Sequence, residues 1–444
     1  MNVSEDARVL CLPAHEISTE DSATWRTESN AYISLVRGRS WNGQGNPRNN
    51  VPIQTSLLNI FSVTPSKVYC YRWPVENPSH FGSGNIGEYL FSNAARRLIG
   101  NNTISTNSDD LINLRREDSY LVVASNVINS SENSCQWATR ILKDIDALKP
   151  GVPVVVMCMG AQAADTKTDI SIHPTTLELL NRIQKRRLCS NQINIGVRGL
   201  YTQDQLTRFG IESQVVGCPS LLYCSLPVTS LSVPRDPKNL AVAATFYSSD
   251  PDAQLAVMEL AARYGASYYI QTEQNLVEWL KTPASLDDTM LLLESSSSAL
   301  QTLTYEQKGF VKLFTRAAGA SYFKYFVQIM REKTILPQNS DEWIGSYEKV
   351  DGPNFIVTTR IHGTIPALLA GKRALLIAHD SRTTELAETL GIPSVKELNS
   401  ALSIEELYEM ADPSRFIEQY PGYAAKMYDF LKLNGIPFSK LSEI

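Results

Sequence analysis

The chain has 444 residues, of which 43% are hydrophobic and 20% charged, and a formal net charge of -5. This length suits two domains of about 150–200 residues each, with enough apolar residues for packed cores. The negative charge argues against a protein whose main partner is a nucleic-acid backbone. The longest apolar stretch, Val152 to Met159, has the length of a strand and falls short of the ~20 residues that span a bilayer.

The cysteines and the N-terminus indicate the compartment. Seven cysteines, without a CxxC pair, are typical of reduced and mostly buried thiols. Glu5 and Asp6 stand where a signal peptide would have a basic start, and no long apolar run follows. Histidines and cysteines lack metal-ligand spacing. We therefore expect a cytoplasmic protein with no transmembrane segment and no metal.

After an N-terminal extension, residues 1–60, strands and helices alternate through a first domain, residues 61–230. A helix is expected from Glu88 to Ile99, and the proline-containing segment from Leu226 to Asn239 is the predicted linker. The predicted strands are apolar, β-branched runs: Val68–Trp73, Ser119–Ala124, Val152–Met159, Gln192–Val197 and Val215–Gly217.

The alternation resumes in a second domain, residues 239–400, and a helical segment, residues 401–444, is expected to pack back on the first domain. The predicted strands here are Leu240–Thr245, Ser267–Gln271, Asn354–Thr359 and Ala374–His379, and the helices include Ala253–Tyr264, Glu306–Ala317, Ser321–Met330 and Gly363–Ala370. Alternation of this kind predicts α/β domains with parallel sheets and right-handed crossovers. We expect two Rossmann-like domains facing across a cleft, with ligands at the carboxyl ends of the strands.

Arg360 and His362 stand where a predicted strand ends. Pro366 lacks an N–H and is tolerated only in the first turn of a helix, so the next helix is expected to begin near Gly363. The unpaired N–H groups and the dipole at a helix N-terminus favour anions. Arg360 and His362 are therefore candidates for an anion site. The alternative is that Arg360 pairs with a structural carboxylate and His362 caps the helix.

Arg198 occupies an equivalent place in the first domain, after a strand and before a helix that Thr202 is expected to open. A guanidinium meets carboxylate or phosphate with two hydrogen bonds. By itself, an Arg after a strand is more often structural. Paired with Arg360 across an interdomain cleft, Arg198 becomes a candidate for holding a small dianion.

Two further segments end in loops that suit a ligand. Gly82 to Gly87 matches G-x-G-x-x-G, but the acidic residue that a dinucleotide site needs is missing from the following strand. Its glycines either approach a substrate closely or form a flexible turn. The segment from His379 to Arg382 follows another predicted strand and is a second candidate for contacting a ligand. The alternative is that Ser381 or Thr383 caps the helix that follows.

These residues resemble the motifs of the polysaccharide pyruvyl transferase family. The segment from Arg198 to Ser220 resembles the family's middle motif, and Thr359 to Gly363, with the turn from Asp380 to Arg382, resembles its C-terminal motif. Asn85-Ile86-Gly87-Glu88 is similar to the N-terminal Asn-x-Gly-Asp, with Glu in place of Asp. Together these segments cover most of residues 80–395.

The resemblance implies the two-domain glycosyltransferase-B architecture and transfer of a pyruvyl group, derived from the enolpyruvyl unit of phosphoenolpyruvate, to sugar hydroxyls of a polysaccharide or its precursor. No cofactor is expected beyond this donor, and peripheral access to a lipid-linked glycan stays open. His362 is expected to be the catalytic acid and Glu88, the weaker assignment, a base. Asn85 and Gly87 are expected to contact the acceptor. The expected donor-binding residues are Arg198, Arg360, Ile361, Gly363, Thr364 and Arg382.

Two other functions remain open. A glycosyltransferase or other nucleotide-sugar enzyme of the same architecture would use the segment from His379 to Glu385 for the nucleotide. A non-catalytic glycan-binding protein is the second, and the presence of Arg198, Arg360 and His362 argues against it.

Overall fold

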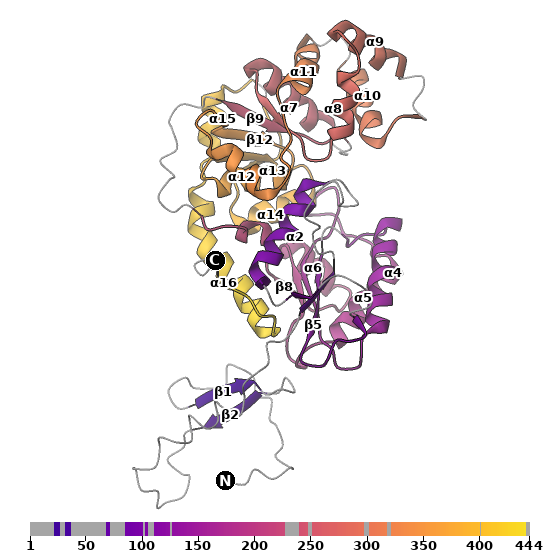
Figure 1. The fold of residues 1–444 in the computed structure, drawn as a ribbon, viewed down its shortest axis with the longest axis vertical. Helices are drawn as coiled ribbons and strands as arrows, with labels where there is room; N and C mark the ends of the chain where they lie inside the picture. Colours follow the sequence, from indigo (N-terminus) through magenta and orange to yellow (C-terminus); the bar gives the residue numbers. More distant parts are fainter. Residues whose placement is uncertain are drawn as a thin grey trace, which may run out of the picture.

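The computed structural model contains two α/β domains and a short antiparallel hairpin, β1 (Ser22–Arg26) with β2 (Tyr32–Val36) (Figure 1). Apart from this hairpin, the predicted extension lies outside the described residues, as do Gly82, Gly84 and most of the predicted linker. The structure describes residues 22–26, 32–36, 68–71, 85–100, 103–104, 111–124, 127–226, 239–246, 251–296, 302–317, 321–399 and 401–440.

The first domain is built on a parallel sheet with the strand order β4-β3-β5-β6-β7-β8. The strands are β3 (Val68–Tyr71), β4 (Thr103–Ile104), β5 (Ser119–Val123), β6 (Val154–Met159), β7 (Ile195–Val197) and β8 (Gln214–Val215). Every residue of β5 and β6 is buried, which explains why their sequences are continuous apolar runs. The helices of this domain are α2 (Ile86–Ile99), α4 (Glu132–Ala147), α5 (Pro174–Lys185) and α6 (Leu200–Thr207).

The second domain has a parallel sheet with the order β11-β10-β9-β12-β13-β14. The strands are β9 (Leu240–Ala243), β10 (Ser267–Tyr269), β11 (Thr334–Ile335), β12 (Phe355–Thr358), β13 (Arg373–Ile377) and β14 (Ser394–Val395). Counted within the domain, the order is 3-2-1-4-5-6, which is that of Rossmann domains. The two parallel sheets confirm the predicted pair of Rossmann-like domains.

Helices surround the second sheet and form most of the upper part of Figure 1. They are α7 (Pro251–Tyr264), α8 (Gln274–Lys281), α9 (Leu286–Ser296), α10 (Tyr305–Arg316), α11 (Ser321–Glu332), α12 (Ser340–Glu348), α13 (Ile361–Leu369) and α14 (Ser381–Leu390). Four of them, α8 to α11, lie between β10 and β11 in the chain and form a helical layer above the sheet.

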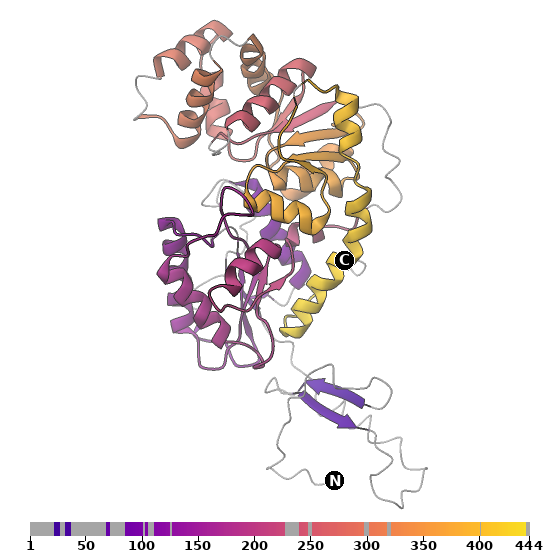
Figure 2. The ribbon, with the colours of Figure 1, turned by 180° about the vertical axis from the view of Figure 1, so that it is seen from behind.

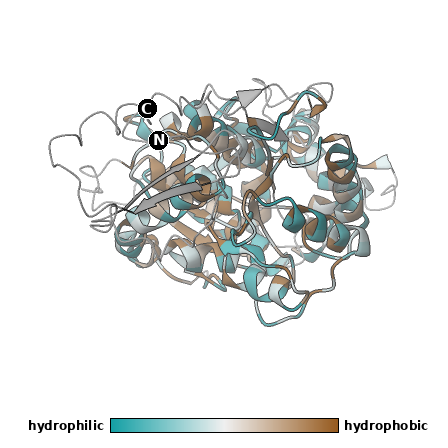
Figure 3. Ribbon diagram, turned by 90° about the horizontal axis from the view of Figure 1, so that it is seen from below, coloured by the Kyte–Doolittle hydropathy of each residue, from teal (hydrophilic) through white to brown (hydrophobic). Residues whose placement is uncertain are grey.

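One apolar cluster joins the two domains. It contains Phe91 of α2, Ile365 of α13 and Met427 of the C-terminal helix, all nearly inaccessible to solvent. Figure 3 shows hydrophobic stretches in the middle of the molecule and hydrophilic ones on peripheral helices. Burial of this shared apolar surface stabilises the interdomain contact. No helix within the described residues is long and apolar enough to cross a membrane.

The C-terminal helix α16 (Ser414–Leu433) runs from the second domain back along the first (Figure 2). Its Tyr423 hydroxyl donates a hydrogen bond to the carbonyl of Cys218, and Asn434 donates to the carbonyl of Ile193 at 2.9 Å. The helical segment predicted from Ser403 to Leu433 is two helices, α15 (Ile404–Met410) and α16. They break before Pro413, because a proline disfavours helical conformation in the residue before it.

Several helices begin earlier than predicted, α2 and α6 among them. Helix α2 begins at Ile86, two residues before Glu88, because the Asn85 side chain accepts from the N–H of Gly87 and caps it. Helix α6 begins at Leu200 with Gly199 as its N-cap residue, so Thr202 does not cap it. In both cases a short polar side chain has a partner that the local sequence pattern does not reveal.

Candidate functional site

The carboxyl ends of β9, β10 and β12 converge on Arg360. In the second sheet β9 lies between β10 and β12, so the chain leaves β9 and β12 in opposite directions, and ligands bind at such a switch point in open α/β sheets. Arg360 follows β12 directly, and its Nε donates to the carbonyl of Ala244, just after β9, at 2.7 Å. The structure therefore places Arg360 where the fold favours a ligand.

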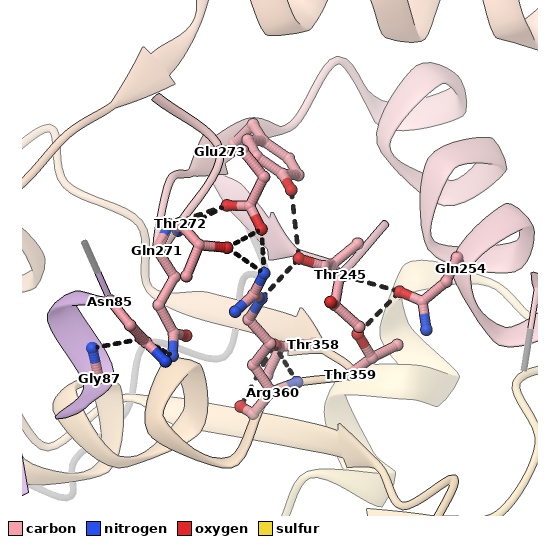
Figure 4. A network of polar contacts seen from close by, with 12 residues as sticks. Asn85, Gly87, Thr245, Gln254, Gln271, Thr272, Glu273, Thr358, Thr359 and Arg360 are labelled. Atoms are coloured by element: carbon pink, nitrogen blue, oxygen red, sulfur yellow. Dashed lines mark hydrogen bonds and ion pairs between the residues drawn. The ribbon is translucent and has the colours of Figure 1, made fainter. Parts of the chain in front are cut away.

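Arg360 is also the partner of a buried carboxylate (Figure 4). Its Nη2 forms an ion pair with Glu273, whose side chain is 0% exposed, and donates to Thr272 Oγ1 at 2.8 Å. The backbone N–H groups of Gln271 and Thr272 donate to Glu273 Oε2, both at 3.0 Å. The structural-carboxylate alternative for Arg360 is thus realised, and Glu273 orients the guanidinium.

Helix α13 begins earlier than predicted, which changes the expected anion site. Arg360 is its N-cap residue, and the N–H groups of Gly363 and Thr364 both donate to the Arg360 carbonyl, at 3.0 and 3.2 Å. The prediction that these two N–H groups are open to a ligand is therefore wrong. The N–H groups that precede the first intrahelical bond belong to Ile361 and His362. Pro366 therefore lies inside the helix and not in its first turn, and Gly371, with φ +71°, follows the end of the helix.

His362 lies at the junction of the two domains. Its ring packs against Phe91 of α2, with 5.6 Å between the ring centroids. Its Nε2 lies 3.6 Å from the sulfur of Cys218, a residue of the first domain. Only 8% of His362 is exposed, so the imidazole sits in a site with little access to water.

Asn85 and Gly87 line the same junction. The Asn85 Oδ1 accepts from the Gly87 N–H and from Gln271 Nε2, both at 3.0 Å, so it links α2 to the second domain (Figure 4). A Cβ on Gly87 would lie 2.2 Å from Gln271 Nε2 and 2.9 Å from the His362 Cβ. A glycine is needed here for close approach. Glu88 is half-buried in the first turn of α2, next to this contact.

Arg198 follows β7 in the first domain. It is 1% exposed, and its Nε donates to the carbonyl of Cys158 at 3.1 Å. Cys158, near the end of β6, has φ +63°, in the left-handed region, beside a register shift between β6 and β7. Such backbone strain is concentrated at functional sites. Arg198 and His362 both act electrostatically on Cys218.

Cys218 and Cys158 form a coupled pair of thiols. Burial alone would raise the pKa of Cys218, but hydrogen bonds with Cys158 and His362 and the charges of His362 and Arg198 lower it well below its usual range. Burial raises the pKa of Cys158 well above its usual range, and its hydrogen bond with Cys218 adds to that. These opposite shifts favour a thiolate on Cys218 and a neutral thiol on Cys158.

Glu385 of α14 entered the sequence analysis only as the end of a nucleotide-binding segment in the nucleotide-sugar alternative. It reaches across to α6, where it accepts from the Thr202 N–H at 2.9 Å and from Thr202 Oγ1 at 2.7 Å. Burial raises the pKa of Glu385 to about 7, although the Thr202 hydrogen bonds and the Arg198 charge oppose this. Because Thr202 is held by Glu385, it serves the domain contact instead of capping α6.

Arg382, expected at the donor, pairs with Asp380 two residues before it, with 2.6 Å from its Nε to Asp380 Oδ2. Asp380 is also the N-cap residue of α14, in a capping box with Thr383. Burial alone would raise the pKa of Asp380, but the charges of Arg382 and His379 lower it. The capping alternative for this turn is thus realised, by Asp380, while Ser381 accepts from the Ala163 N–H across the domain contact at 2.8 Å.

The structure brings together Arg198, Arg360, His362, Asn85 and Gly87, and it adds Glu273, Cys218 and Glu385. Cys218 lies in the segment that resembles the middle motif, but nothing in that pattern assigns it a role, and Glu273 and Glu385 are single residues whose partners are far away in the sequence. The described part of the chain contains no group of three or more His, Cys, Asp or Glu residues that could hold a metal ion.

Comparison with known proteins shows which family the chain belongs to. A family model described as polysaccharide pyruvyl transferase matches residues 65–381, well over half of the chain. No curated protein matches the sequence significantly.

Several solved structures are similar at low identity. They are UDP-N-acetylglucosamine 2-epimerase from Rickettsia bellii (12% identity, 73% of this chain and 75% of that chain, TM-score 0.36), a variant of the wall teichoic acid polymerase TagF (10%, 85% and 87%, 0.31) and apo UGT2 of Phytolacca americana (11%, 87% and 86%, 0.29). These scores are too low to carry an argument about fold or function.

Proposed function

Since the chain belongs to the polysaccharide pyruvyl transferase family, we propose that it transfers a pyruvyl group from phosphoenolpyruvate to hydroxyls of a saccharide. The observation that carries this proposal is the position of His362, which follows Arg360 by two residues and lies against the first domain beside Cys218, a thiol on which the charges of His362 and Arg198 both act. A site with an imidazole and two buried guanidinium groups suits a substrate that carries both a carboxylate and a phosphate.

The reaction sets three tasks for the protein. A proton is delivered to the methylene carbon of the donor, which leaves a cation-like centre at the neighbouring carbon. A sugar hydroxyl attacks this carbon, and its proton passes to a base. Inorganic phosphate leaves, a second hydroxyl closes the ketal, and the departing phosphate takes up the proton of that hydroxyl. The site must therefore hold two anionic groups, supply one proton and accept another.

Arg198 and Arg360 suit the first task. Glu273 already orients the Arg360 guanidinium, but a guanidinium has five N–H donors in a planar fork and can serve a carboxylate and a ligand together. Ile361 is assigned to the donor through its backbone at the start of α13. Gly363, Thr364 and Arg382 are retained as neighbours of the donor that shape its pocket.

His362 suits the second task, because it is a protonatable ring at the meeting point of the two domains. For the third task Glu385 is a stronger candidate than Glu88, since its carboxyl pKa of about 7 matches a general base near neutral pH. Asn85 and Gly87 stay assigned to the acceptor side, next to His362. We also propose a cytoplasmic location, which suits the free thiols of the described residues.

The test is turnover. The purified chain is incubated with phosphoenolpyruvate and a panel of saccharides, and both phosphate release and a pyruvyl mass increment on the acceptor are measured. His362→Asn, which removes the acid but keeps a polar side chain in the first turn of α13, is expected to lower kcat by about 10²–10⁴-fold. The exposed control Glu388→Gln, one turn from Glu385 on α14, should leave kcat unchanged.

Two results would contradict the proposal. One is near-normal kcat in His362→Asn, which would assign the ring to structure. The other is thermal stabilisation by a nucleotide sugar and none by phosphoenolpyruvate, which would make the chain a nucleotide-sugar enzyme.

A further inference from the structure

A cluster of sulfur and hydroxyl groups lies beside His362. The residues assigned above to phosphoenolpyruvate and to the saccharide do not include this cluster. Cys218, at 0% exposure, lies 3.6 Å from His362 Nε2. Ser220 Oγ donates to the Cys218 sulfur at 3.0 Å, and Cys158 forms a further side-chain hydrogen bond with it. A buried sulfur with three polar neighbours is unusual for a residue that only fills the core.

The backbone around Cys218 is held tightly. Gly217, just before it, has φ +75°, and a Cβ there would lie 2.4 Å from the Tyr423 ring. The Tyr423 hydroxyl donates to the carbonyl of Cys218. The position of the sulfur is therefore determined by contacts on a turn and on α16, independently of His362, which is what a positioning group requires.

The hydrogen bond from Ser220 makes the Cys218 sulfur an acceptor. The sulfur accepts from the Ser220 hydroxyl, and burial and the Cys218 charge raise the pKa of the neighbouring Cys158 thiol, which favours its protonated form. The charged groups that face the sulfur are His362 and Arg198, and both favour a thiolate there, whereas the Tyr423 side chain stays protonated because burial raises its pKa. An acceptor sulfur opposite Nε2 leaves the ring nitrogen as the donor.

We propose that Cys218 positions His362 for proton transfer, through a hydrogen bond from Nε2–H of the ring to the thiolate sulfur. This inference rests on the proposed function, because it gives the proton transfer its geometry. The arrangement follows the logic by which a fixed anion orients a catalytic imidazole, with sulfur in place of the usual carboxylate.

The proton balance is simple. The imidazolium gives its Nδ1 proton to the methylene carbon of the donor and becomes the neutral Nε2–H form, which stays bonded to the thiolate. The proton released by the attacking hydroxyl later restores the ring. The sulfur forms no covalent bond and is neither oxidised nor reduced, so no further reactant is needed.

Cys218→Ala tests the inference, with Cys224→Ala as the matched control. Cys224 lies six residues further along the same segment, and burial raises the pKa of its thiol to about 11, so it stays a neutral thiol. We expect Cys218→Ala to lower kcat about 10²-fold, with a much smaller change in the KM for phosphoenolpyruvate, and Cys224→Ala to change neither. Cys218→Ser should behave like Cys218→Ala, because a hydroxyl stays neutral.

A readout that does not depend on turnover separates this inference from the proposed function. In protein labelled with ¹⁵N-histidine, the Nε2 resonance of His362, assigned by its loss in His362→Asn, should shift in Cys218→Ala and not in Cys224→Ala. Cys218→Ala should also lose the ultraviolet absorbance of one thiolate at neutral pH, and Cys224→Ala should keep it. An unchanged resonance and unchanged absorbance in folded Cys218→Ala would overturn the inference even if the enzyme transfers pyruvate.

Absence of turnover in the wild-type protein, with the resonance and absorbance changes present, would overturn the proposed function and leave the Cys218–His362 bond standing. If Cys218→Ala fails to fold, as judged by its melting temperature, Cys218→Ser carries the same measurements, since it keeps the approximate volume of the side chain. Wild-type kcat in Cys218→Ser together with an unshifted His362 resonance would again reject the positioning role.

Discussion

The two strand-end arginines differ in how the fold surrounds them. Arg360 lies at the switch point of the second sheet and is ion-paired with Glu273. Arg198 follows β7, away from the place between β3 and β5 where the first sheet changes direction. Its neighbours are groups whose protonation is shifted: Cys218, Cys158 and Glu385.

The site therefore has two parts: Arg360, which Glu273 holds in a fixed orientation, and Arg198, whose neighbours have shifted pKa values. A guanidinium held by a buried carboxylate and a backbone carbonyl has a fixed orientation. A buried guanidinium beside two thiols and a carboxyl group with a shifted pKa instead influences which of them carries a proton. Under the proposed function, the Arg360 side would mainly orient the donor and the Arg198 side would mainly influence proton transfer.

The largest expected effect comes from removing Glu273, the carboxylate that is ion-paired with Arg360. Glu273→Ala leaves a buried, uncompensated guanidinium and should lower the free energy of unfolding by about 3–5 kcal/mol, measured by denaturant titration. The control Asp146→Ala breaks an ion pair with Arg182 in which Asp146 is 60% exposed, and should cost at most about 1 kcal/mol. Equal effects of the two substitutions would show that Glu273 is not needed to balance Arg360.

On the Arg198 side, the raised pKa of Glu385 predicts that the free energy of unfolding depends on pH. Its pKa is raised by burial from 4.5 to about 7, so the folded state binds the proton more tightly than the unfolded state. The contribution of Glu385 to stability is complete below pH 4.5 and is lost as the pH rises to about 7, by at most about 3 kcal/mol.

Melting temperatures of the wild type and of Glu385→Gln across this pH range check that prediction. The substituted protein should lose less stability than the wild type as the pH rises, because an amide does not ionise. Glu388→Gln, on the exposed side of the same helix, should follow the wild type. Parallel curves for wild type and Glu385→Gln would place the titration elsewhere.

Donor affinity sharpens the comparison of the two arginines. Arg198→Ala and Arg360→Ala should each weaken phosphoenolpyruvate binding ten- to a hundredfold, about 1.5–3 kcal/mol, measured by calorimetry. Arg360→Lys should recover only part of this, because an ammonium lacks the planar fork. Arg316→Ala, which breaks an exposed pair with Asp252, serves as the control. Unchanged affinity in Arg360→Ala would remove Arg360 from the donor site.

The smallest effect concerns the contact between α2 and the Arg360 side. A Cβ on Gly87 would force Gln271 and His362 to move, so Gly87→Ala should cost about 1–3 kcal/mol of unfolding free energy. Gly345→Ala, inside α12 with nothing within 4 Å of the new Cβ, should stabilise by about 0.5–1 kcal/mol. A stabilising Gly87→Ala would mean that the junction is open enough to accept a methyl group.

Much of the fold could be predicted because buried parallel strands carry their own signal. Continuous apolar, β-branched runs such as Val154–Met159 are recognisable without any partner. Short edge strands were missed: β4, β11 and β14 have two residues each, which is too little for a periodicity. Helix starts were misplaced where a cap depended on a distant partner, as at Thr202.

The candidate site was only half predictable. Arg198, Arg360 and His362 could be selected because a strand end followed by a helix start is visible in the sequence and is a preferred ligand position. Glu273 and Glu385 could not be selected, since an isolated glutamate is normally a solvated surface residue. Their 0% and 2% exposures are properties of the assembled fold.

The sequence by itself determined the two parallel sheets and which basic residues end their strands, because hydrophobic periodicity and turn chemistry act over a few neighbouring residues. The tertiary structure alone decided which groups face those residues. Glu273 is 87 residues from Arg360, Cys218 is 144 from His362, and Thr202 is 183 from Glu385. Contacts across such distances arise only when the chain packs into its domains and the domains pack together, since burial there removes water and makes each polar partner necessary.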